Sequence, residues 1–494
     1  MLSRFIVVVC ITALTACASR PPAIAPNVVQ PESLTDVGHY LEARARLIEQ
    51  ERAMRLGAGL VLTPDEQSAN RRLTALKQVE FERTRAHFPP AHSFLDARTR
   101  QLIAESPVFA VMRRMPKGGI LHTHGAATGD FRWLVSHATY RADAYIYVGS
   151  AAQPVSGALR ISQQPPGEGW QRVTELRAAA PDARAFDEEI YRSITLGDED
   201  RAAPDIWLEF GRIFQRFSGL LFGDPGVLSE YWRRILDELI DENVQYLEAR
   251  NLPIDEAIVR HAHKRDAAFA VNFIVSSGRS ATRERVAQTL AAVLDGRAKD
   301  PRLVGFDLVE EEDRTNSNLF FLEEILAARL EADRRGIGLR LYLHSGETNW
   351  AENENLYDAV LLGASRIGHG LALVKHPLLM DLVKARDIAV EVCPISNQVL
   401  GFVPDLRNHP AVHYINRGLP IVLAPDDPAI MQHSLSHDFY VAFMAWGLDL
   451  KALKQIAMNS LIYSALSPDD KRRALDEWQR RWDEFVTWVN DMPE

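Results

Sequence analysis

Cysteine is scarce in this chain of 494 residues, which has three. Cys10 and Cys17 lie in an apolar N-terminal segment, so only Cys393 remains for the folded body, and a lone thiol forms no internal disulfide. A chain of this length buries enough apolar surface to fold without disulfides. Cys393 lies in an apolar run, where a free thiol is most often inert packing, and the sequence contains no Gly-x-Ser-x-Gly. Both observations argue against a cysteine or serine hydrolase.

Long apolar runs are also missing. Phe5–Leu14 is apolar, but a membrane-spanning helix needs about 20 such residues. With Arg4 before it and Leu14-Thr15-Ala16-Cys17 at its end, this stretch resembles a bacterial lipoprotein signal; an ordinary secretory signal is the alternative. We predict a signal peptide over residues 1–17, lipid on Cys17 as the only membrane attachment, and a Pro-rich tether over 18–34. The expected location is the bacterial cell envelope: outer membrane, periplasm or cell surface.

Basic residues are outnumbered, with 56 Lys and Arg against 66 Asp and Glu. A net charge of −10 argues against nucleic acid as the main partner. No internal repeat of fixed period is present, which excludes a solenoid.

Residues 35–108 are predicted to form a helical N-terminal extension. Val37–Arg55 and Pro64–His87 carry apolar residues at helical spacing, and Thr63 before Pro64 is typical of a helix start. Their apolar faces must dock either on the main domain or on a second subunit.

Residues 109–494 are predicted to form a (β/α)₈ TIM barrel. Short apolar runs alternate with segments of helical composition, such as Asn318–Arg335, which indicates parallel strands with helical crossovers. An open doubly wound sheet is the alternative. The barrel is favoured because the polar motifs stand at the carboxyl ends of the runs, where barrel active sites form. The eight runs are Gly119–His124, Val244–Arg250, Ala270–Ser276, Leu303–Val309, Leu339–His344, Arg366–His369, Ile388–Cys393 and Leu419–Ala424.

The first interval between strands is unusually long. Residues 150–203, rich in Gly, Pro, Ala and charge, are predicted to be an insertion on the barrel. Ile206–Phe222 then reads as a helix with apolar residues at helical spacing, including Trp207. A core-facing helix is the favoured interpretation; an apolar wall over an active site is the alternative.

His122-Thr-His124 ends the first predicted strand. Residues i and i+2 of a strand point to the same face, so both imidazoles can reach one metal ion. His344 and Asp426 end two later runs, and three nitrogens and one oxygen suit a single Zn²⁺ with a position left for water.

Three further residues complete a hydrolytic site. Glu347 follows His344 in a turn and can donate a proton; His369 can hold or deprotonate a water molecule; Asp427 can bind water or a substrate nitrogen. Each has a plainer interpretation, such as a capped loop histidine or an ordinary Asp-Asp-Pro turn. Their common placement at successive strand ends favours the site.

Longer motifs make the sequence resemble the adenosine deaminase family, most closely its secreted branch, the adenosine deaminase-related growth factors. The match runs from about Met54 to Leu466. It is carried by Met115-Pro-Lys-Gly-Gly119, Val244-Gln-Tyr-Leu-Glu-Ala-Arg250, Gly305-Phe-Asp-Leu-Val309, His344-Ser-Gly-Glu-Thr348, Arg366-Ile-Gly-His-Gly370, Glu391-Val-Cys-Pro-Ile-Ser-Asn-Gln-Val399 and Asn459-Ser-Leu-Ile-Tyr-Ser464.

The resemblance implies zinc-dependent hydrolytic deamination of adenosine or 2′-deoxyadenosine, releasing ammonia and an inosine-type product. Zinc would be bound by the four residues named above, and hydroxide would attack C6 of the purine. Glu347 would protonate N1, His369 would orient the hydroxide and shuttle its proton, and Asp427 would hydrogen-bond at N7. The N-terminal helices would form a homodimer.

Two positions depart from the family pattern. The family usually has an Asp one or two residues after the second histidine, at a ribose contact; here stand Gly125 and Ala126. It also has a Gly after the strand ending in Asp-Leu-Val, near purine N3; here stands Glu310, in an acidic run that would disfavour phosphorylated substrates. With Trp207, these are the candidate substrate-facing positions. The alternatives are an amidohydrolase for another or an N6-substituted purine nucleoside, and a non-catalytic surface binding protein.

Overall fold

Two compact units divide the chain, Met1–Ala53 and Met54–Glu494. The computed structural model describes residues 36–150, 153–251 and 254–493, so the predicted signal peptide, Cys17 and the tether lie outside the described residues. The described part of the first unit consists mainly of helix α1 (Val37–Met54), which has no buried residue. The homodimer through the N-terminal helices stays a prediction.

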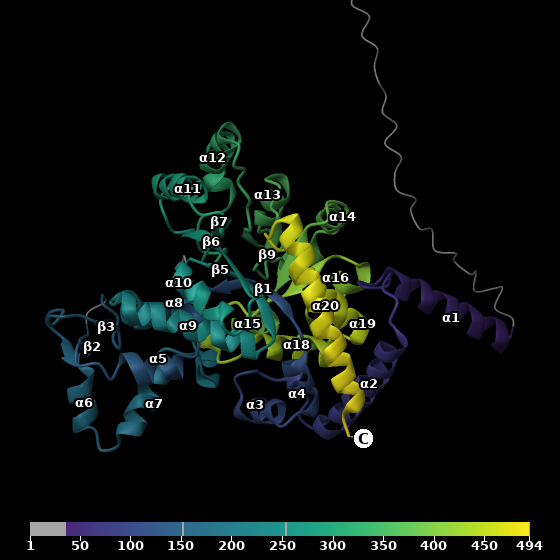
Figure 1. Cartoon of the computed structure of the whole chain (residues 1–494), viewed down its shortest axis with the longest axis horizontal. Helices are drawn as coiled ribbons and strands as arrows, with labels where there is room; N and C mark the ends of the chain where they lie inside the picture. The colour runs from purple at the N-terminus through teal and green to yellow at the C-terminus, as the bar shows by residue number, and fades with distance from the viewer. Residues whose placement is uncertain (1–35, 151–152, 252–253, 494) are drawn as a thin grey trace, which may run out of the picture. The chain divides into compact units, whose positions relative to one another are not determined.

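A closed barrel of eight parallel strands forms the centre of the second unit (Figure 1). Two four-stranded sheets, in the orders β1-β5-β6-β7 and β11-β10-β9-β8, meet at both edges through the parallel bridges Thr123–Asp426 and Phe306–Leu341. The predicted (β/α)₈ barrel is confirmed. The strands are β1 (Gly118–His124), β5 (Val244–Arg250), β6 (Ala270–Gly278), β7 (Leu303–Val309), β8 (His344–Ser345), β9 (Arg366–His369), β10 (Ala389–Val392) and β11 (Ile421–Leu423).

Helices follow the strands along the chain, as a barrel requires. Glycines in the left-handed conformation end two of them, Gly336 after α12 and Gly418 after α16, where a side chain would be strained. The helices are α9 (Pro225–Asp241), α10 (Glu256–His263), α11 (Arg283–Arg297), α12 (Leu322–Arg335), α13 (Asn355–Leu361), α14 (Pro377–Ala385), α15 (Pro394–Val399), α16 (Ala411–Arg417), α17 (Pro428–Met431), α18 (Leu435–Ala445), α19 (Leu450–Ile462) and α20 (Pro468–Asp491).

The fifth barrel strand is shorter than its apolar run predicts. Only His344–Ser345 pair with β9, while Leu339–His344 was the predicted span. Towards β7 the segment makes a single bridge, in which Phe306 donates to Arg340 O (3.0 Å) and Tyr342 donates to Phe306 O (3.0 Å). The segment still occupies the position of the fifth barrel strand, but it pairs with β7 through this one bridge alone.

The helices α2 (Pro64–Thr84), α3 (Ala97–Ala104) and α4 (Pro107–Arg114) precede the barrel. α2 starts at the predicted residues: Thr63 and Glu66 form a reciprocal capping box, and Pro64 occupies the first turn. Lys454 Nζ and Trp482 Nε1 both donate to Glu66 Oε1, at 2.6 and 2.7 Å. α2 therefore docks on the carboxyl-terminal helices α19 and α20 of its own unit.

The long segment between β1 and β5 contains a small sheet that the sequence did not predict. Three antiparallel strands in the order β3-β2-β4 are flanked by helices, on one side of the barrel in Figure 1. Strands of three or four residues separated by Gly and Pro give no clear alternation. The elements are α5 (Phe131–Ala138), β2 (Ala144–Tyr147), β3 (Leu159–Ile161), β4 (Trp170–Arg172), α6 (Val173–Ala179), α7 (Ala183–Ser193) and α8 (Ile206–Phe222).

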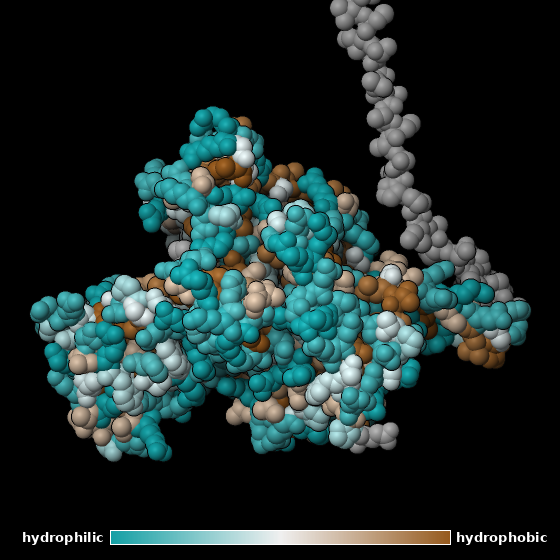
Figure 2. Space-filling model, viewed as in Figure 1, coloured by the Kyte–Doolittle hydropathy of each residue, from teal (hydrophilic) through white to brown (hydrophobic). Residues whose placement is uncertain are grey.

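Hydrophilic residues dominate the face of the molecule in Figure 2, with apolar areas between them. Among the described helices we find none with the length and apolar character needed to cross a bilayer.

Candidate active site

A cleft of about 600 Å³ opens at the carboxyl ends of the barrel strands. It gathers most of the residues that the sequence singled out. Its lining includes His124, Trp207, Phe210, Phe214, Glu310, Glu311, Arg314, His344, Glu347, His369, Asp426 and Asp427.

Closure of the barrel brings Asp426 against β1. Thr123 Oγ1 and the His124 N–H donate to the Asp426 carbonyl, at 2.8 and 3.1 Å. Asp426 Oδ1 lies 3.2 Å from His122 Nε2 and 3.3 Å from His124 Nε2, while Ser396 Oγ donates to Oδ2 at 2.7 Å. Asp426 and His369 have φ angles of 64° and 60°, a conformation that costs energy outside glycine and clusters at functional sites.

Four buried side chains can hold a metal ion. One ligand atom each from His122, His344, His369 and Asp426 lies within 4.8 Å of the others; His124, Asp426 and Asp427 form an overlapping group. His122 Nε2, His369 Nε2 and Asp426 Oδ1 make no hydrogen bond within the described part of the chain. Buried polar atoms without partners are costly, and a bound cation would satisfy His122 Nε2 and Asp426 Oδ1. The residues therefore fit a metal.

A buried carboxylate orients each of two histidines. His122 Nδ1 donates to Glu391 Oε2 and His344 Nδ1 donates to Asp307 Oδ2, both at 2.7 Å. This leaves each Nε2 facing the cluster, the arrangement usual for metal-binding histidines. Burial lowers the pKa of His344 to about 4, so its ring is uncharged and available as a ligand.

Two buried arginines hold these carboxylates. Arg250 donates to Asp307 and Glu391, both at 2.7 Å, and Arg366 donates to Glu391 and Glu248, both at 2.6 Å. Burial alone would raise the pKa of Glu391, but Arg250 and Arg366 hold it well below the usual value. Sequence reasoning did not assign roles to this network. In the sequence, the only indication of this network is that charged residues stand inside otherwise apolar predicted strands.

Glu347 is a buried carboxyl group in this cleft. Its pKa is raised well above the usual value, first by burial and then by the neighbouring Asp426. Its backbone N–H donates to Glu312 Oε1 at 2.7 Å, which fixes the turn after β8. Burial and Asp426 also raise the pKa of Asp427. The Glu347 and Asp427 carboxyl groups, beside the group of metal-ligating side chains, thus keep their protons to a higher pH than exposed carboxyl groups do.

Helix α8 forms one wall of the cleft. Phe217, Leu220 and Leu221 are buried in the core, while Trp207, Phe210 and Phe214 line the cleft. Both interpretations of this helix therefore hold, on different faces. At its start the N-cap residue Asp205 accepts two hydrogen bonds from Arg314, at 2.5 and 2.9 Å, and Arg314 also donates to Glu311 at 2.8 Å.

Glu310 lines the cleft with a backbone that favours glycine, at φ 91°. Its Oε2 accepts the Ser280 N–H at 2.8 Å, so the side chain leans towards the turn after β6. A Cβ placed on Gly278 would stand 2.3 Å from Glu310 Oε1, which shows how closely the two approach.

Gly125 does not line the cleft but packs under Trp232 of α9. A Cβ at this position would stand 2.9 and 3.0 Å from the indole and 3.3 Å from Arg250 O. Trp232 is 1% exposed and has little room to move. This pocket therefore cannot take an Asp at position 125 without rearrangement.

We expect Gly125→Asp to lower the free energy of unfolding by about 1–3 kcal/mol, the usual cost of overpacking a core. Thermal unfolding would measure the loss. Gly59→Asp is the matched control, because a Cβ there meets no atom within 4 Å. A G125D variant as stable as the wild type would show that Trp232 moves aside freely.

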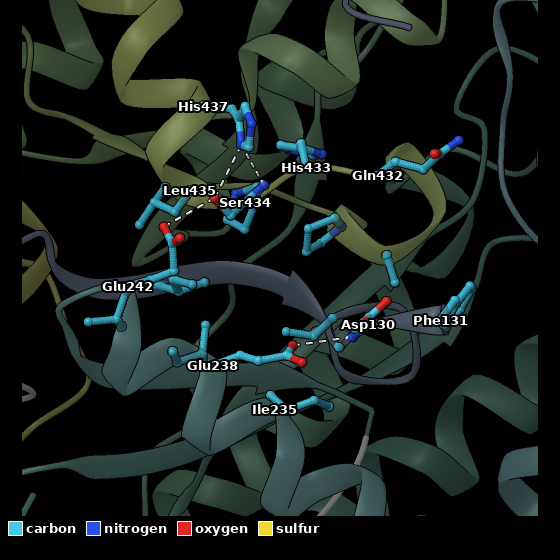
Figure 3. A pocket seen from close by; sticks show the side chains of 18 of the residues that line it. Asp130, Phe131, Ile235, Glu238, Glu242, Gln432, His433, Ser434, Leu435 and His437 are labelled. Atoms are coloured by element: carbon cyan, nitrogen blue, oxygen red, sulfur yellow. Dashed lines mark hydrogen bonds between the residues drawn. The ribbon is translucent and has the colours of Figure 1, made fainter. Parts of the chain in front are cut away.

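A second cavity, of about 410 Å³, lies on the outer side of β1 and contains none of the predicted site residues (Figure 3). Several of its polar groups pair with one another: the Asp130 N–H donates to Glu238 at 3.2 Å, and Ser434 Oγ donates to Glu242 at 3.1 Å. The chemistry belongs to the first cleft.

Known proteins are similar in sequence to this chain. A family model described as adenosine deaminase matches residues 243–480, and one described as adenosine/AMP deaminase N-terminal matches residues 10–112. Adenosine deaminase 2 from Sus scrofa is 36% identical over 493 residues, covering 92% of this chain and 95% of that protein. The chain belongs to the adenosine deaminase family.

Solved structures share the fold of this adenosine deaminase family member. An amidohydrolase from Burkholderia ambifaria, solved with bound zinc, is 18% identical, covers 77% of this chain and 94% of its own, and has a TM-score of 0.56. ADAL from Arabidopsis, solved with IMP, is 17% identical, covers 76% and 99%, and has a TM-score of 0.54. The family resemblance and the prediction of an enzyme are both confirmed.

Proposed function

We propose that this chain hydrolyses adenosine and 2′-deoxyadenosine to inosine and 2′-deoxyinosine, with release of ammonia. One observation carries the proposal: an acid with a raised pKa, Glu347, stands beside a buried cluster of unpaired metal-ligating atoms in one cleft. The relatives named adenosine deaminase support the substrate. The envelope location, the lipid on Cys17 and the homodimer belong to the same proposal and rest on the sequence.

Zinc is the proposed metal, bound by His122, His124, His344 and Asp426. Tetrahedral ligands at roughly 2.1 Å from a zinc ion lie about 3.4 Å apart, close to the 3.2 and 3.3 Å that separate Asp426 Oδ1 from His122 and His124. The fold neighbour solved with zinc supports this choice. When bound, zinc polarises a water molecule and lowers its pKa towards neutrality.

The protein side chains then handle the purine. Protonated Glu347 donates its proton to N1, which makes C6 more open to attack by water. Purine N7 only accepts hydrogen bonds, so a carboxyl group that contacts it must carry a proton. Because its pKa is raised, Asp427 can keep that proton and donate it in a hydrogen bond to N7. His369 orients the attacking water and passes on its proton. Trp207, Phe210 and Phe214 offer an apolar wall to the purine.

The charges at the rim favour nucleosides over nucleotides. Arg314 is the one Lys or Arg among the described residues that line the cleft, and Asp205 and Glu311 already neutralise it. Glu310 adds a further carboxylate. A 5′-phosphate placed near this rim would meet like charge without a free cation.

We expect kcat/KM for AMP to be at least tenfold lower than for adenosine, with a gap that narrows as salt screens the rim. Ammonia release from both substrates at two salt concentrations measures this. Glu311→Gln should narrow the gap too, because it frees Arg314 of one partner. Equal turnover of AMP and adenosine would refute the charge argument.

A substrate panel tests the assignment itself: adenosine, 2′-deoxyadenosine, adenine and N6-methyladenosine, each followed by release of ammonia or methylamine. We expect the two nucleosides with an unsubstituted amine to be the best substrates. Gly125 and Glu310 motivate the second candidate, an N6-substituted or other purine. Turnover of N6-methyladenosine or adenine alone would establish that candidate instead.

A further inference from the structure

A chain of buried hydrogen bonds runs behind His369, on the side away from the metal ligands. The Ala411 N–H donates to His409 Nδ1 at 3.0 Å. His409 Nε2 lies 3.1 Å from Asn397 Oδ1, and Asn397 Nδ2 lies 3.4 Å from His369 Nδ1. Asn397, His409 and His369 are each at most 1% exposed, so water does not compete for these contacts.

The direction of each bond in this chain follows from its first donor. A backbone N–H can only donate, so His409 Nδ1 is the acceptor and the ring proton sits on Nε2. Burial lowers the pKa of His409 to about 3, which keeps that ring uncharged. His409 Nε2–H then donates to Asn397 Oδ1, and this fixes the orientation of the amide. The amide N–H₂ must point at His369 Nδ1 as a donor.

Neighbouring contacts hold the chain in place. The Phe402 and Val403 N–H groups donate to the Asn397 carbonyl at 2.9 and 3.0 Å. Trp446 lies against the His409 ring, with centroids 5.1 Å apart, and its own Nε1 donates to Leu406 O at 2.8 Å. Neither Asn397 nor His409 has room to adopt the opposite arrangement without breaking a buried bond.

We propose that Asn397 and His409 are positioning residues that fix the tautomer of His369, with its proton on Nε2 and its lone pair on Nδ1. The Nε2–H then faces the metal cluster, 4.0 Å from Asp426 Oδ2, where it meets the attacking water as a donor. Nδ1 accepts the Asn397 amide N–H, and Glu347 Oε1 lies 3.3 Å from it. The tautomer is a property of the fold; only its use in catalysis rests on the proposed function.

Nitrogen NMR of ¹⁵N-histidine-labelled protein tests the tautomer directly, because a protonated and an unprotonated ring nitrogen have well-separated shifts. The signals of residue 369 are assigned as those lost in His369→Gln. We expect the wild type to show a protonated Nε2 and an unprotonated Nδ1 at this ring. A protonated Nδ1 in the wild type would overturn the proposal without any variant and without any assay of activity.

Asn397→Asp is the decisive variant. An aspartate of the same shape accepts from both histidines, so it favours the proton on His369 Nδ1. We expect the tautomer to invert and kcat for adenosine to fall about 100-fold or more, with little change in KM, since a wrongly protonated histidine disables the site rather than substrate binding. A wild-type tautomer or undiminished kcat in folded N397D would contradict the proposal.

Two substitutions of His409 form a matched pair and cover the case in which N397D fails to fold. His409→Gln places an amide donor where Nε2 stood, whereas His409→Asn is too short to reach Asn397. We expect H409Q to keep most of the kcat and the wild-type tautomer, and H409N to lose both. If H409Q and H409N had the same kcat and the same His369 tautomer, the proposed positioning by His409 and Asn397 would be wrong. If no variant and no wild type deaminates adenosine, the spectra still decide the tautomer, so the two failures are distinguishable.

Discussion

Glu347→Gln is expected to lower kcat for adenosine by about 10³-fold while leaving the fold and the bound metal unchanged. General acid catalysis contributes about 10²–10⁴-fold to a rate, and an amide keeps the shape of the carboxyl group without a transferable proton. The raised pKa of Glu347 leaves it protonated, so it can supply a proton within the cleft. Initial rates, metal content and thermal unfolding of the variant together measure the effect.

The control for this change is Glu352→Gln, a glutamate in the exposed loop after Thr348 and outside the cleft. It makes the same carboxyl-to-amide change, so any general effect of this substitution on the assay appears in both variants. We expect its kcat to stay within about twofold of the wild type, since surface substitutions rarely matter beyond their site. An E347Q variant that keeps a third or more of the wild-type rate would remove Glu347 from its role as the acid.

Glu391→Gln is expected to lower the free energy of unfolding by about 3–5 kcal/mol, the cost of breaking one partner out of a buried ion network. Its carboxylate accepts hydrogen bonds from Arg250, Arg366 and His122, and all four side chains are at most 1% exposed. The amide leaves two arginines short of charge and turns a donor towards one of them. The melting temperature should fall by roughly 3–5 °C, because the unfolding entropy of so large a unit is high. Metal affinity should fall by about 10–100-fold because His122 loses its orienting partner.

The pH dependence of this loss has a definite sign. The folded-state pKa of Glu391 is depressed, so the carboxylate stabilises the fold above the pKa of an unfolded glutamate, about 4.3, and this stabilisation disappears as pH falls. The gap between wild type and E391Q should therefore shrink in acid. Glu331→Gln, which removes exposed ion pairs to Arg334 and Arg335, is the control and should change stability little. If E391Q had the same melting temperature as the E331Q control, the buried ion network would not stabilise the fold.

Local patterns predicted most of the elements in this chain. Ile206–Phe222 repeats its aromatic residues at helical spacing, and α8 has those bounds. Thr63 and Pro64 mark the start of α2 through capping chemistry that needs only neighbouring residues. Seven of the eight predicted strands include most or all of an observed strand, because a parallel strand buried on both faces is continuously apolar.

Contacts between distant residues explain what the sequence could not predict. The β3-β2-β4 sheet depends on pairing of very short strands, which no periodicity reveals. Glu391 and Asp307 orient His122 and His344 from 269 and 37 residues away. The fit of Gly125 under Trp232 joins positions more than a hundred residues apart, so a missing Asp could be read from the sequence but its steric cause could not.

Removal and return of the metal tests whether deamination by this protein depends on zinc. The full chain is treated with a chelator, its zinc content is measured, and conversion of adenosine to inosine is followed before and after titration with Zn²⁺. We expect activity to disappear with the metal and to return in proportion to added zinc, reaching its maximum at one ion per chain. Full activity in the metal-free protein, or no turnover of adenosine with one zinc ion bound, would contradict the proposed function.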